Sequence, residues 1–567
     1  MSYRGGPEPQ DTRNVFLAIG LSLAIFLGFE FFYNAPQRQR ELEERARIEQ
    51  AQAEAQAQEE ARTPSRSGEA AAPGAPSAPV SREQALAAAS GGRLAIDTPT
   101  MHGAISLDGA RFDDLRLANY NRQLNPSSGE VTLLSPIQSQ YGHDAFFGWE
   151  LQSGGDVSTL ASANTVWSAP EGARLTPQSP VTLTTTQNGL AIERTIAVDE
   201  HYMFTITDTV RNQGGAPVSV RPFGAVRRQG MPEDYRQSPI VHQGLIGVFG
   251  DSYEQVNFQN ADKHARNKVR GRAGADERIE ERQDQGGWFG ITEHYWLAAI
   301  IPDQNERYSA YFDSRPEDNR NDYRAAYRGQ WREAATGGAV TYTQRFYAGA
   351  KEGDLQQAYQ EGSDDAQPIP RFDEAIDWGN FWFLTRPFFL WLLHPLGQWA
   401  GNFGIAILLS TIVIKLLLFP LVYQSFKAMA KMRALQPKMK DIQERYAADK
   451  QRQQQEMLKL YQTEKINPVA GCVPILLQIP VFYALYKTLT VTIEMRHAPF
   501  FGWINDLSAR DPTSIFNLFG LLPFDPAAIP VIGPFLLIGA WPILYGISMW
   551  ALQGLSPPAT DPMIDAR

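Results

Sequence analysis

The chain has 567 residues, a net charge of −10 at pH 7 and a single cysteine. This length allows two or three domains, and the low mean hydropathy means that only part of the chain can lie in a membrane. A single cysteine excludes an internal disulfide framework. The sequence contains no GxxxxGK(S/T), HExxH or CxxC motif. These absences indicate that the protein does not drive its work by hydrolysing a nucleotide, and we expect no enzymatic activity, metal or cofactor.

The N-terminal region predicts a membrane anchor followed by a tether. Val15 to Tyr33 is apolar apart from Glu30, and a helix of this length spans a bilayer. Phe31 and Phe32 lie where a cleavage site needs small residues, so we expect an uncleaved anchor with a cytoplasmic N-terminus. Residues 36–90 are rich in Ala, Gln, Pro and Ser and are expected to form a flexible linker that decouples the next domain from the membrane.

Residues 91–364 show the alternating pattern of β-strands. Leu190, Ile192, Ile196 and Val198 alternate with polar residues, and Asn188-Gly189 marks a turn before this run. About 270 residues of this kind predict a large β-sandwich outside the membrane. Its histidines have no metal-ligand spacing. Residues 365–400 are aromatic but interrupted by prolines. This pattern favours an amphipathic helix that lies in the interface on the outer side of the membrane.

Lys415 is the central charged residue of the expected membrane helix 401–424. It lies 12 residues before Lys427, about 18 Å along a helix, which is near the middle of a hydrocarbon core about 30 Å thick. Exposing a lysine there to lipid costs about 2.5–3.5 kcal/mol. The side chain either snorkels to the cytoplasmic headgroups or faces a wet cavity within a helical bundle, and the depth favours the cavity.

Residues 425–466 are expected to form a cytoplasmic helical hairpin. Ser425 to Lys465 holds ten Lys or Arg against five Asp or Glu, which the positive-inside rule places in the cytoplasm. Met432, Leu435, Met439, Ile442 and Tyr446 follow coiled-coil spacing. Five basic residues are the candidate contacts of this hairpin: Lys438, Lys440, Arg445, Lys450 and Arg452. They either only retain the loop inside or bind the ribosome or a targeting factor, and the seam favours binding.

Two further apolar segments, residues 467–493 and 531–553, are long enough to span a membrane. The loop between them, 494–530, is nearly charge-balanced, as expected outside, and 554–567 would form a cytoplasmic tail. The pattern therefore predicts a multi-domain membrane protein with a helical transmembrane bundle, a cytoplasmic helical hairpin and an all-β outer domain.

Several motifs resemble the YidC membrane protein insertase of Gram-negative bacteria, in the YidC/Oxa/Alb family. They are the run Asn467 to Pro480, the pair Gln436-Pro437, and the stretch from Pro499-Phe500 through Asp506-Leu507 to Asp511-Pro512. The dense part of the resemblance covers about Asp377 to Met563. It implies a periplasmic β-supersandwich and an inner-membrane, multi-pass bundle with a hydrophilic groove. The implied partners are nascent membrane proteins, the Sec translocon, the ribosome and membrane lipids, and no DNA.

The resemblance also implies roles for particular residues. Lys415 takes the place of the arginine usual in the family groove, so the charge is kept and the fork geometry is lost. Thr411, Gln478 and Gln553 match other polar groove positions, although for Gln478 a hydrogen bond between packed helices is the structural alternative. Members of the family continue beyond Asp561-Pro562-Met563 with two more membrane helices, so we expect this sequence to be part of a longer chain.

Two other classes of function compete with an insertase. A secondary transporter or channel would also contain an intramembrane lysine, but the sequence shows no inverted repeat and too few spans. A membrane-anchored carbohydrate-binding or carbohydrate-modifying protein is suggested by the resemblance of the β domain to mutarotase-like sandwiches, but no carboxylate pair can be assigned in it. The insertase is therefore the favoured interpretation.

Overall fold

The computed structural model describes residues 79–88, 91–153, 156–162, 164–270, 278–317, 320–363, 366–447, 449–464, 473–509, 511, 513–522, 526 and 538–555. The expected anchor, most of the expected linker and the motif before Val473 lie outside these residues. The described residues form two compact units, one containing 76–432 and 459–511 and the other containing 433–458 and 512–567. Each unit is considered by itself.

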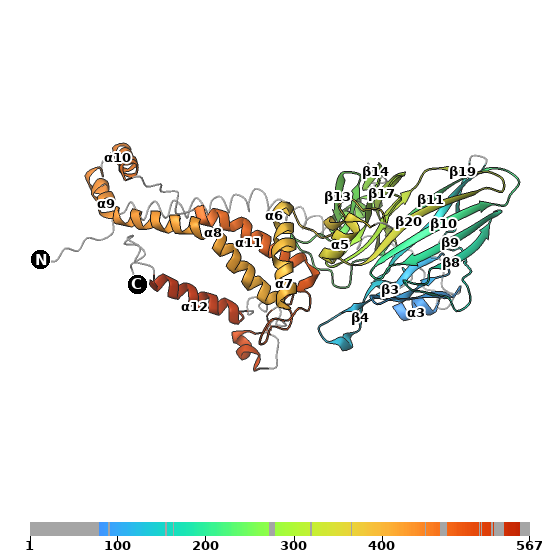
Figure 1. Ribbon diagram of the computed structural model, residues 1–567, viewed down its shortest axis with the longest axis horizontal. Coiled ribbons are helices and arrows are strands. Elements are labelled where there is room, and N and C mark those ends of the chain that lie inside the picture. Colours follow the sequence, from blue (N-terminus) through green and yellow to red (C-terminus); the bar gives the residue numbers. More distant parts are fainter. Residues whose placement is uncertain are drawn as a thin grey trace, which may run out of the picture. The chain divides into compact units, whose positions relative to one another are not determined.

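The larger unit contains a β-sandwich whose two sheets contribute to one hydrophobic core (Figure 1). Among the described residues, one sheet has the strand order β13 (Ser252–Asn257), β12 (Gly244–Phe249), β15 (Gly287–Thr292), β16 (Trp296–Ile301), β20 (Ala339–Ala350), β10 (Met203–Asn212), β9 (Leu190–Val198) and β8 (Val181–Gln187). The other has the order β14 (Glu280–Gln285), β17 (Arg307–Glu317), β18 (Arg320–Arg328), β11 (Val218–Gln229), β5 (His143–Ser153), β3 (Arg111–Asn121), β2 (Met101–Ser106), β1 (Arg93–Asp97) and β7 (Arg174–Leu175), with β19 (Arg332–Ala334), β4 (Glu130–Leu134) and β6 (Asp156–Leu160) at its sides. The predicted β-sandwich is confirmed.

The predicted alternation in β9 is also confirmed, with one polar residue at a core position. Leu190 and Ile196 are buried, and Asn188 and Gly189 have φ values of 51° and 74°, as a tight hairpin to β8 requires. Arg194 occupies the same inward face and is fully buried. Its guanidinium donates two hydrogen bonds of 2.7 Å to Asp208, which lies directly opposite on β10. The pair joins two neighbouring strands within the core as a bidentate ion pair.

The end of the expected linker is ordered against the sandwich. Residues Arg82–Ala87 form α3, which starts with a capping box between Ser81 and Gln84. Arg82 forms an ion pair with Asp114, and Val80 pairs with Ser139. Residues 80–88 therefore do not belong to the flexible linker expected over 36–90, because the cap, the ion pair and the bridge hold them against the sandwich.

Helix α4 (Phe258–Val269) is inserted between strands of the sandwich. The helices that follow the last strand in this unit are α5 (Gly353–Glu361), α6 (Trp382–Phe388), α7 (His394–Ala400), α8 (Phe403–Ala434) and α11 (Val473–Val491). Between α6 and α7, Phe389–Leu393 forms a π-helical turn. This turn lies between Pro387 and Pro395, where the regular hydrogen-bond pattern cannot continue. Thr385, Phe389, Leu393 and Gly397 are buried at a spacing of four, and Trp391 and Trp399 are exposed. The segment has the expected amphipathic character.

Helix α8 is longer than the sequence suggested. It does not end at residue 424 but continues through Pro420 to Ala434, and the chain first turns at Leu435. At about 1.5 Å per residue its 32 residues extend about 48 Å. Pro420 removes one hydrogen bond, and the helix tolerates this loss. The first basic residues of the expected hairpin, such as Lys427, therefore belong to α8.

The β-sandwich and the helices of the same unit share a packed junction. Val241 from the sandwich packs with Trp378, Phe389, Ala406 of α8 and Val491 of α11 in one apolar cluster. The expectation that the linker decouples the β domain from the membrane helices is therefore wrong at this junction. The contact forms through the residues that follow the sandwich in the chain, which the linker does not affect.

In the smaller unit, α9 (Gln436–Arg445) and the first part of α10 (Lys450–Thr463) form the expected hairpin, and α12 (Ala540–Leu555) is a separate helix. Leu435 is buried, and Met439, Ile442 and Tyr446 are half-buried. The apolar seam predicted for the hairpin is present in these four residues.

Removing one partner of the buried ion pair should destabilise the sandwich strongly. We expect Arg194→Met to leave the Asp208 carboxylate buried without its partner and to cost about 3–5 kcal/mol. Urea-dependent proteolysis of the full chain in detergent measures this loss. Arg174→Met, which breaks an exposed ion pair with Asp97, should cost less than about 1 kcal/mol. Equal sensitivity of the two variants would contradict the role of the buried pair.

Acid should weaken the junction through His294. Its Nε2–H donates to the Thr490 carbonyl at 2.7 Å, and burial lowers the pKa of His294 to about 4. The unfolded chain takes up this proton near pH 6.5, so stability present above pH 6.5 is lost as pH falls from 6.5 to 4. Thermal unfolding across this pH range gives the slope of the free energy of unfolding against pH. The substitution His294→Gln should reduce this slope by on the order of 1 kcal/mol per pH unit. Substituting the exposed His201 by Gln should leave the slope unchanged, and an unchanged slope in His294→Gln would refute the assignment.

Candidate functional site

A groove of about 590 Å³ lies between α8 and α11, with Phe388 of α6 at one side. Its polar lining residues are Ser410, Thr411, Lys415, Ser425 and Gln478. The remaining lining is apolar and includes Phe419, Phe426 and Phe482. The structure thus brings together Lys415, Thr411 and Gln478, three of the residues that the sequence singled out.

Helical periodicity places these residues on facing surfaces. On α8, Thr411, Lys415, Leu418 and Val422 follow spacings of four, three and four residues, which defines one side of a helix. On α11, Gln478, Val481, Phe482 and Leu485 follow the corresponding pattern. The groove is therefore a property of two regular helices and does not depend on a loop.

The hydroxyl groups of the groove are tied to the helix backbone. Ser410 and Thr411 donate to the Ile407 carbonyl at 2.9 and 2.8 Å, and their oxygens still have lone pairs to accept further bonds. Lys415 is exposed, and it forms no ion pair with any described residue. The groove therefore offers one cation and several hydrogen-bonding groups to a molecule that enters it.

The opposite side of α8 is apolar and unpacked within the described residues. Leu416 and Leu417 are 67% and 74% exposed, and they point away from the groove side by helical spacing. Within Phe403–Ala428 an 18-residue window has a mean hydropathy of 2.6, and this is the one described helix that is long and apolar enough to cross a membrane. One side of α8 therefore suits lipid and the other suits polar groups.

Some groove residues were missed from the sequence, and one predicted residue is not placed by the structure. Ser410, Ser425 and Phe388 line the groove. The spacing that links Thr411, Lys415 and Val422 would have identified Ser425 one turn further along the helix. Gln553 lies in the last turn of α12, and its side chain is outside the described part of the chain. Its role in the groove stays a prediction.

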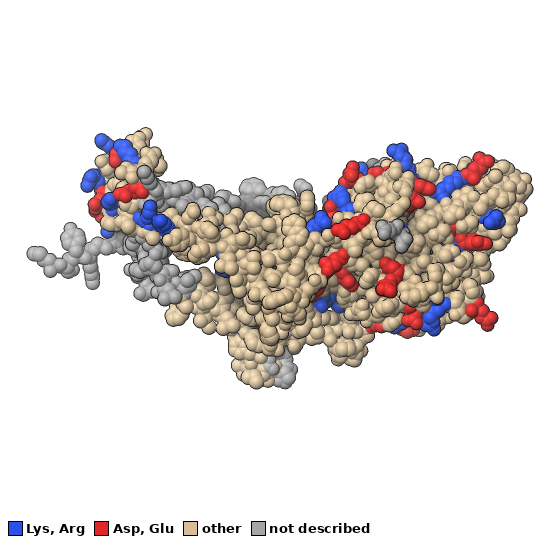
Figure 2. Space-filling model, viewed as in Figure 1, with Lys and Arg blue, Asp and Glu red and all other residues tan. Residues whose placement is uncertain are grey.

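The five basic residues predicted for the hairpin are exposed on its two helices, Lys438, Lys440 and Arg445 on α9 and Lys450 and Arg452 on α10. Basic and acidic side chains both occur over α9 and α10 (Figure 2). Lys440 lies 4.0 Å from Glu444, and the Arg452 guanidinium lies 5.8 Å from the centre of the Tyr446 ring. The hairpin therefore presents an accessible surface of mixed charge with an excess of basic groups.

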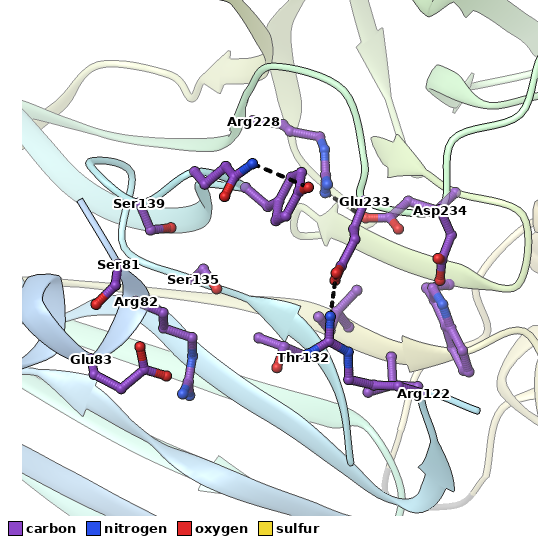
Figure 3. A pocket seen from close by; sticks show the side chains of 16 residues that line it. Ser81, Arg82, Glu83, Arg122, Thr132, Ser135, Ser139, Arg228, Glu233 and Asp234 are labelled. Carbon is purple, nitrogen blue, oxygen red and sulfur yellow. Dashed lines mark hydrogen bonds and ion pairs between the residues drawn. The ribbon is translucent and has the colours of Figure 1, made fainter. Parts of the chain in front are cut away.

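The β-sandwich contains a separate polar pocket of about 320 Å³ (Figure 3). Ser81, from the N-terminal cap of α3, lies on one side of it. Arg122 forms an ion pair with Glu233, and Arg228 forms one with Glu293. These charges neutralise each other, and the pocket contains no feature that assigns a ligand.

Two protein families match the chain. A family described as the YidC periplasmic domain matches residues 93–391, and a family described as the 60Kd inner membrane protein matches residues 395–566. The first match covers the sandwich together with α6, and the second covers α8, the hairpin, α11 and α12.

Individual relatives are similar over almost the whole chain. A membrane protein insertase YidC of Maricaulis maris is 44% identical over 558 residues, which cover 98% of this chain and 89% of the relative. A membrane protein insertase YidC of Caulobacter sp. is 42% identical over 581 residues, which cover 98% of this chain and 89% of the relative. A crystal structure described as an active YidC insertase is 16% identical and covers 80% of this chain and 87% of that chain, with a TM-score of 0.27. Similarity at the level of that structure supports no inference.

Proposed function

Because this chain belongs to the YidC family of membrane protein insertases, we propose that it inserts proteins into the inner membrane through the groove between α8 and α11. The observation that carries the proposal is the Lys415 side chain, placed beside hydroxyl and amide groups in a groove on a helix whose other side is apolar. A transporter or a carbohydrate-binding protein would leave the family membership without explanation.

In this proposal the groove receives the polar segment of the substrate that must cross the membrane. Lys415 attracts acidic groups, while Thr411, Gln478 and Gln553 replace hydrogen bonds that the segment loses on leaving water. The apolar helix of the substrate enters lipid beside Leu416 and Leu417. Partitioning of about 20 apolar residues contributes several kcal/mol to the reaction. The groove lowers the barrier for the polar part, and the lipid provides the driving force.

We propose that the chain crosses the inner membrane several times, with the sandwich in the periplasm. The spans are the anchor 1–35, α8, α11 and the segment 531–553, and the α6–α7 segment lies in the outer interface, where its exposed tryptophans suit the headgroup region. The proposed partners are nascent membrane proteins, the Sec translocon, the ribosome and anionic lipids. The hairpin faces the cytoplasm, where the ribosome and inner-leaflet headgroups carry negative charge.

The charge of Lys415 should matter more than its shape. We expect Lys415→Arg to retain insertion, and Lys415→Ala to lower insertion of a substrate with an acidic periplasmic segment about tenfold, equivalent to about 1.4 kcal/mol. Lys415→Glu should be worse, because it repels the same segment. Insertion into vesicles from a strain depleted of its own insertase measures the effect.

Lys427→Ala is the matched control, because Lys427 is exposed on the same helix and does not line the groove. This variant should insert the substrate normally. Full activity of Lys415→Glu would show that the groove cation has no part in insertion.

The basic residues of the hairpin should bind ribosomes. Replacing Lys438, Lys440, Arg445, Lys450 and Arg452 by Gln keeps Lys427, Lys431 and Arg433 to preserve orientation. We expect ribosome co-sedimentation to fall and to become less dependent on salt, and protease mapping to show unchanged topology.

A second variant controls for disturbance of the hairpin. Glu444→Gln, Asp449→Asn and Glu456→Gln change the same helices but remove negative charge, so binding should persist or rise. Undiminished binding after removal of the five basic residues would assign them to topology alone.

A further inference from the structure

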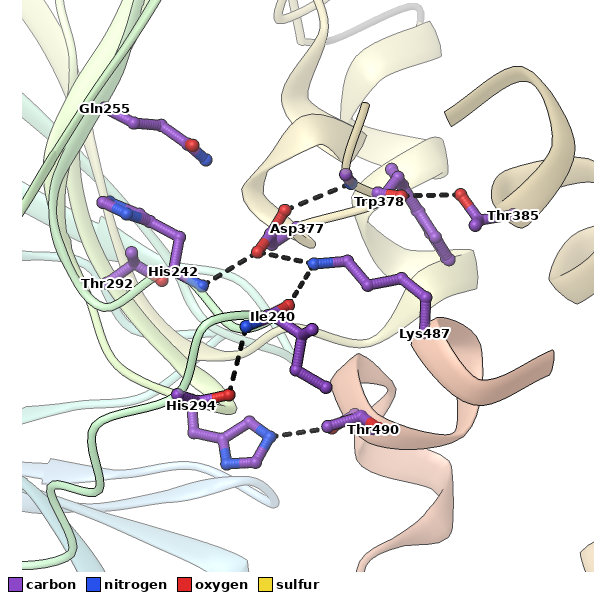
Figure 4. Close-up of polar contacts among 12 residues, drawn as sticks. Ile240, His242, Gln255, Thr292, His294, Asp377, Trp378, Thr385, Lys487 and Thr490 are labelled. Carbon is purple, nitrogen blue, oxygen red and sulfur yellow. Dashed lines mark hydrogen bonds and ion pairs between the residues drawn. The ribbon is translucent and has the colours of Figure 1, made fainter. Parts of the chain in front are cut away.

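Lys487 is the charged residue of α11, and its environment differs from that of Lys415. Its side chain is 4% exposed, and its ammonium lies 2.7 Å from the Asp377 carboxylate (Figure 4). The ammonium also donates to the Ile240 carbonyl of the β-sandwich. Lys487 is absent from the groove lining. It therefore joins α11 to the sandwich and to the segment before α6.

Asp377 is held in place by backbone groups on two other parts of the chain. The His242 N–H donates to Oδ2 at 2.8 Å, and the Gly379 N–H donates to Oδ1 at 3.1 Å. Gly379 has a φ of 74°, and a Cβ there would lie 3.0 Å from Lys487 Cε. Two backbone N–H groups thus orient the carboxylate independently of the lysine, and the close approach of Gly379 restricts the space around the lysine.

The geometry of α11 relates this ion pair to the groove. Lys487 follows Gln478 by nine residues, which is about two and a half turns, so the two side chains lie on opposite sides of the helix and about 13.5 Å apart along it. Thr490, on the Lys487 side, accepts the hydrogen bond from His294 of the sandwich. A constraint on the Lys487 side therefore fixes which side of α11 faces α8.

We propose that the Lys487–Asp377 ion pair is a positioning contact that sets the rotation and depth of α11, so that Gln478 faces Lys415 across the groove. A buried ion pair suits this role, because the two charges compensate each other only when α11 has one rotation and depth. In any other position each charge would be buried without its partner. Apolar contacts of α11 slide at lower cost. The inference rests on the proposed function for its effect on insertion, and its geometric part stands without it.

The test measures the rotation of α11 by cysteine accessibility. In the full chain carrying Cys472→Ser, single cysteines are placed at Val481 or Leu485, which line the groove, and at Ile479 or Tyr486, which are 59% and 60% exposed outside it. A water-soluble maleimide applied to native membrane vesicles reports which positions contact water. With the ion pair intact, groove cysteines should react about tenfold faster than the others, since thiols in an apolar environment ionise poorly.

Loss of the ion pair should remove this contrast. We expect Lys487→Met and Asp377→Asn each to bring the two labelling rates within about twofold, and Lys487→Arg to restore the contrast by keeping the charge. Asp377→Asn keeps the size of the side chain and an acceptor for one of the two backbone N–H groups, and protease resistance of the sandwich shows whether the variant is folded. Lys427→Met is the matched control. Retained contrast in both Lys487→Met and Asp377→Asn would overturn the proposal.

Insertion assayed in the same vesicles separates this inference from the proposed function. Lost contrast with reduced insertion supports both. Lost contrast with normal insertion supports the positioning contact and counts against the groove as the route of insertion. Retained contrast with reduced insertion overturns the positioning role and leaves the groove in place.

Discussion

A lysine exposed to hydrocarbon costs about 2.5–3.5 kcal/mol, and Lys487 and Lys415 avoid such exposure in two different ways. Lys487 is neutralised by Asp377 and buried at the junction with the sandwich. Lys415 has no ion-pair partner among the described residues and instead lines the groove between α8 and α11. In our proposal, Lys487 holds α11 in position and Lys415 is available to a substrate. The difference follows from the side of the helix that each residue occupies.

The sandwich gives these helices a fixed point. Its core is built from alternating apolar residues and contains the Arg194–Asp208 ion pair. The junction packs against the surface of this sandwich. Val241 and the Ile240 carbonyl belong to the sandwich unit and contact the outer ends of the helices. In the topology that we propose, this arrangement lets a domain outside the membrane set the position of a helix within it. The proposed groove is then preorganised and need not form when a substrate arrives.

Much of this organisation is predictable from the sequence because it depends on periodicity. Period-two alternation in β9 and the Asn188-Gly189 turn predicted the sandwich, and a charge within an apolar run predicted that Lys415 faces a cavity, where the structure has a groove. The contact between Lys487 and Asp377 was not predictable, since it joins residues 110 positions apart and neither sequence pattern contains its partner. Arg194 likewise breaks the alternation of β9 unless Asp208 is known to lie opposite. The length of α8 was underestimated because Pro420 and the basic residues after it both suggested an earlier end.

The central claim is that the polar segment of a substrate passes through the groove. Photo-crosslinking amino acids at Thr411 and Gln478, compared with one at the exposed Leu417 on the other side of α8, test this claim on ribosome-bound nascent chains of a membrane protein. The account predicts that Thr411 and Gln478 capture the polar segment and that Leu417 captures the apolar helix or nothing. Capture of the polar segment at Leu417, with none at Thr411 or Gln478, would contradict it.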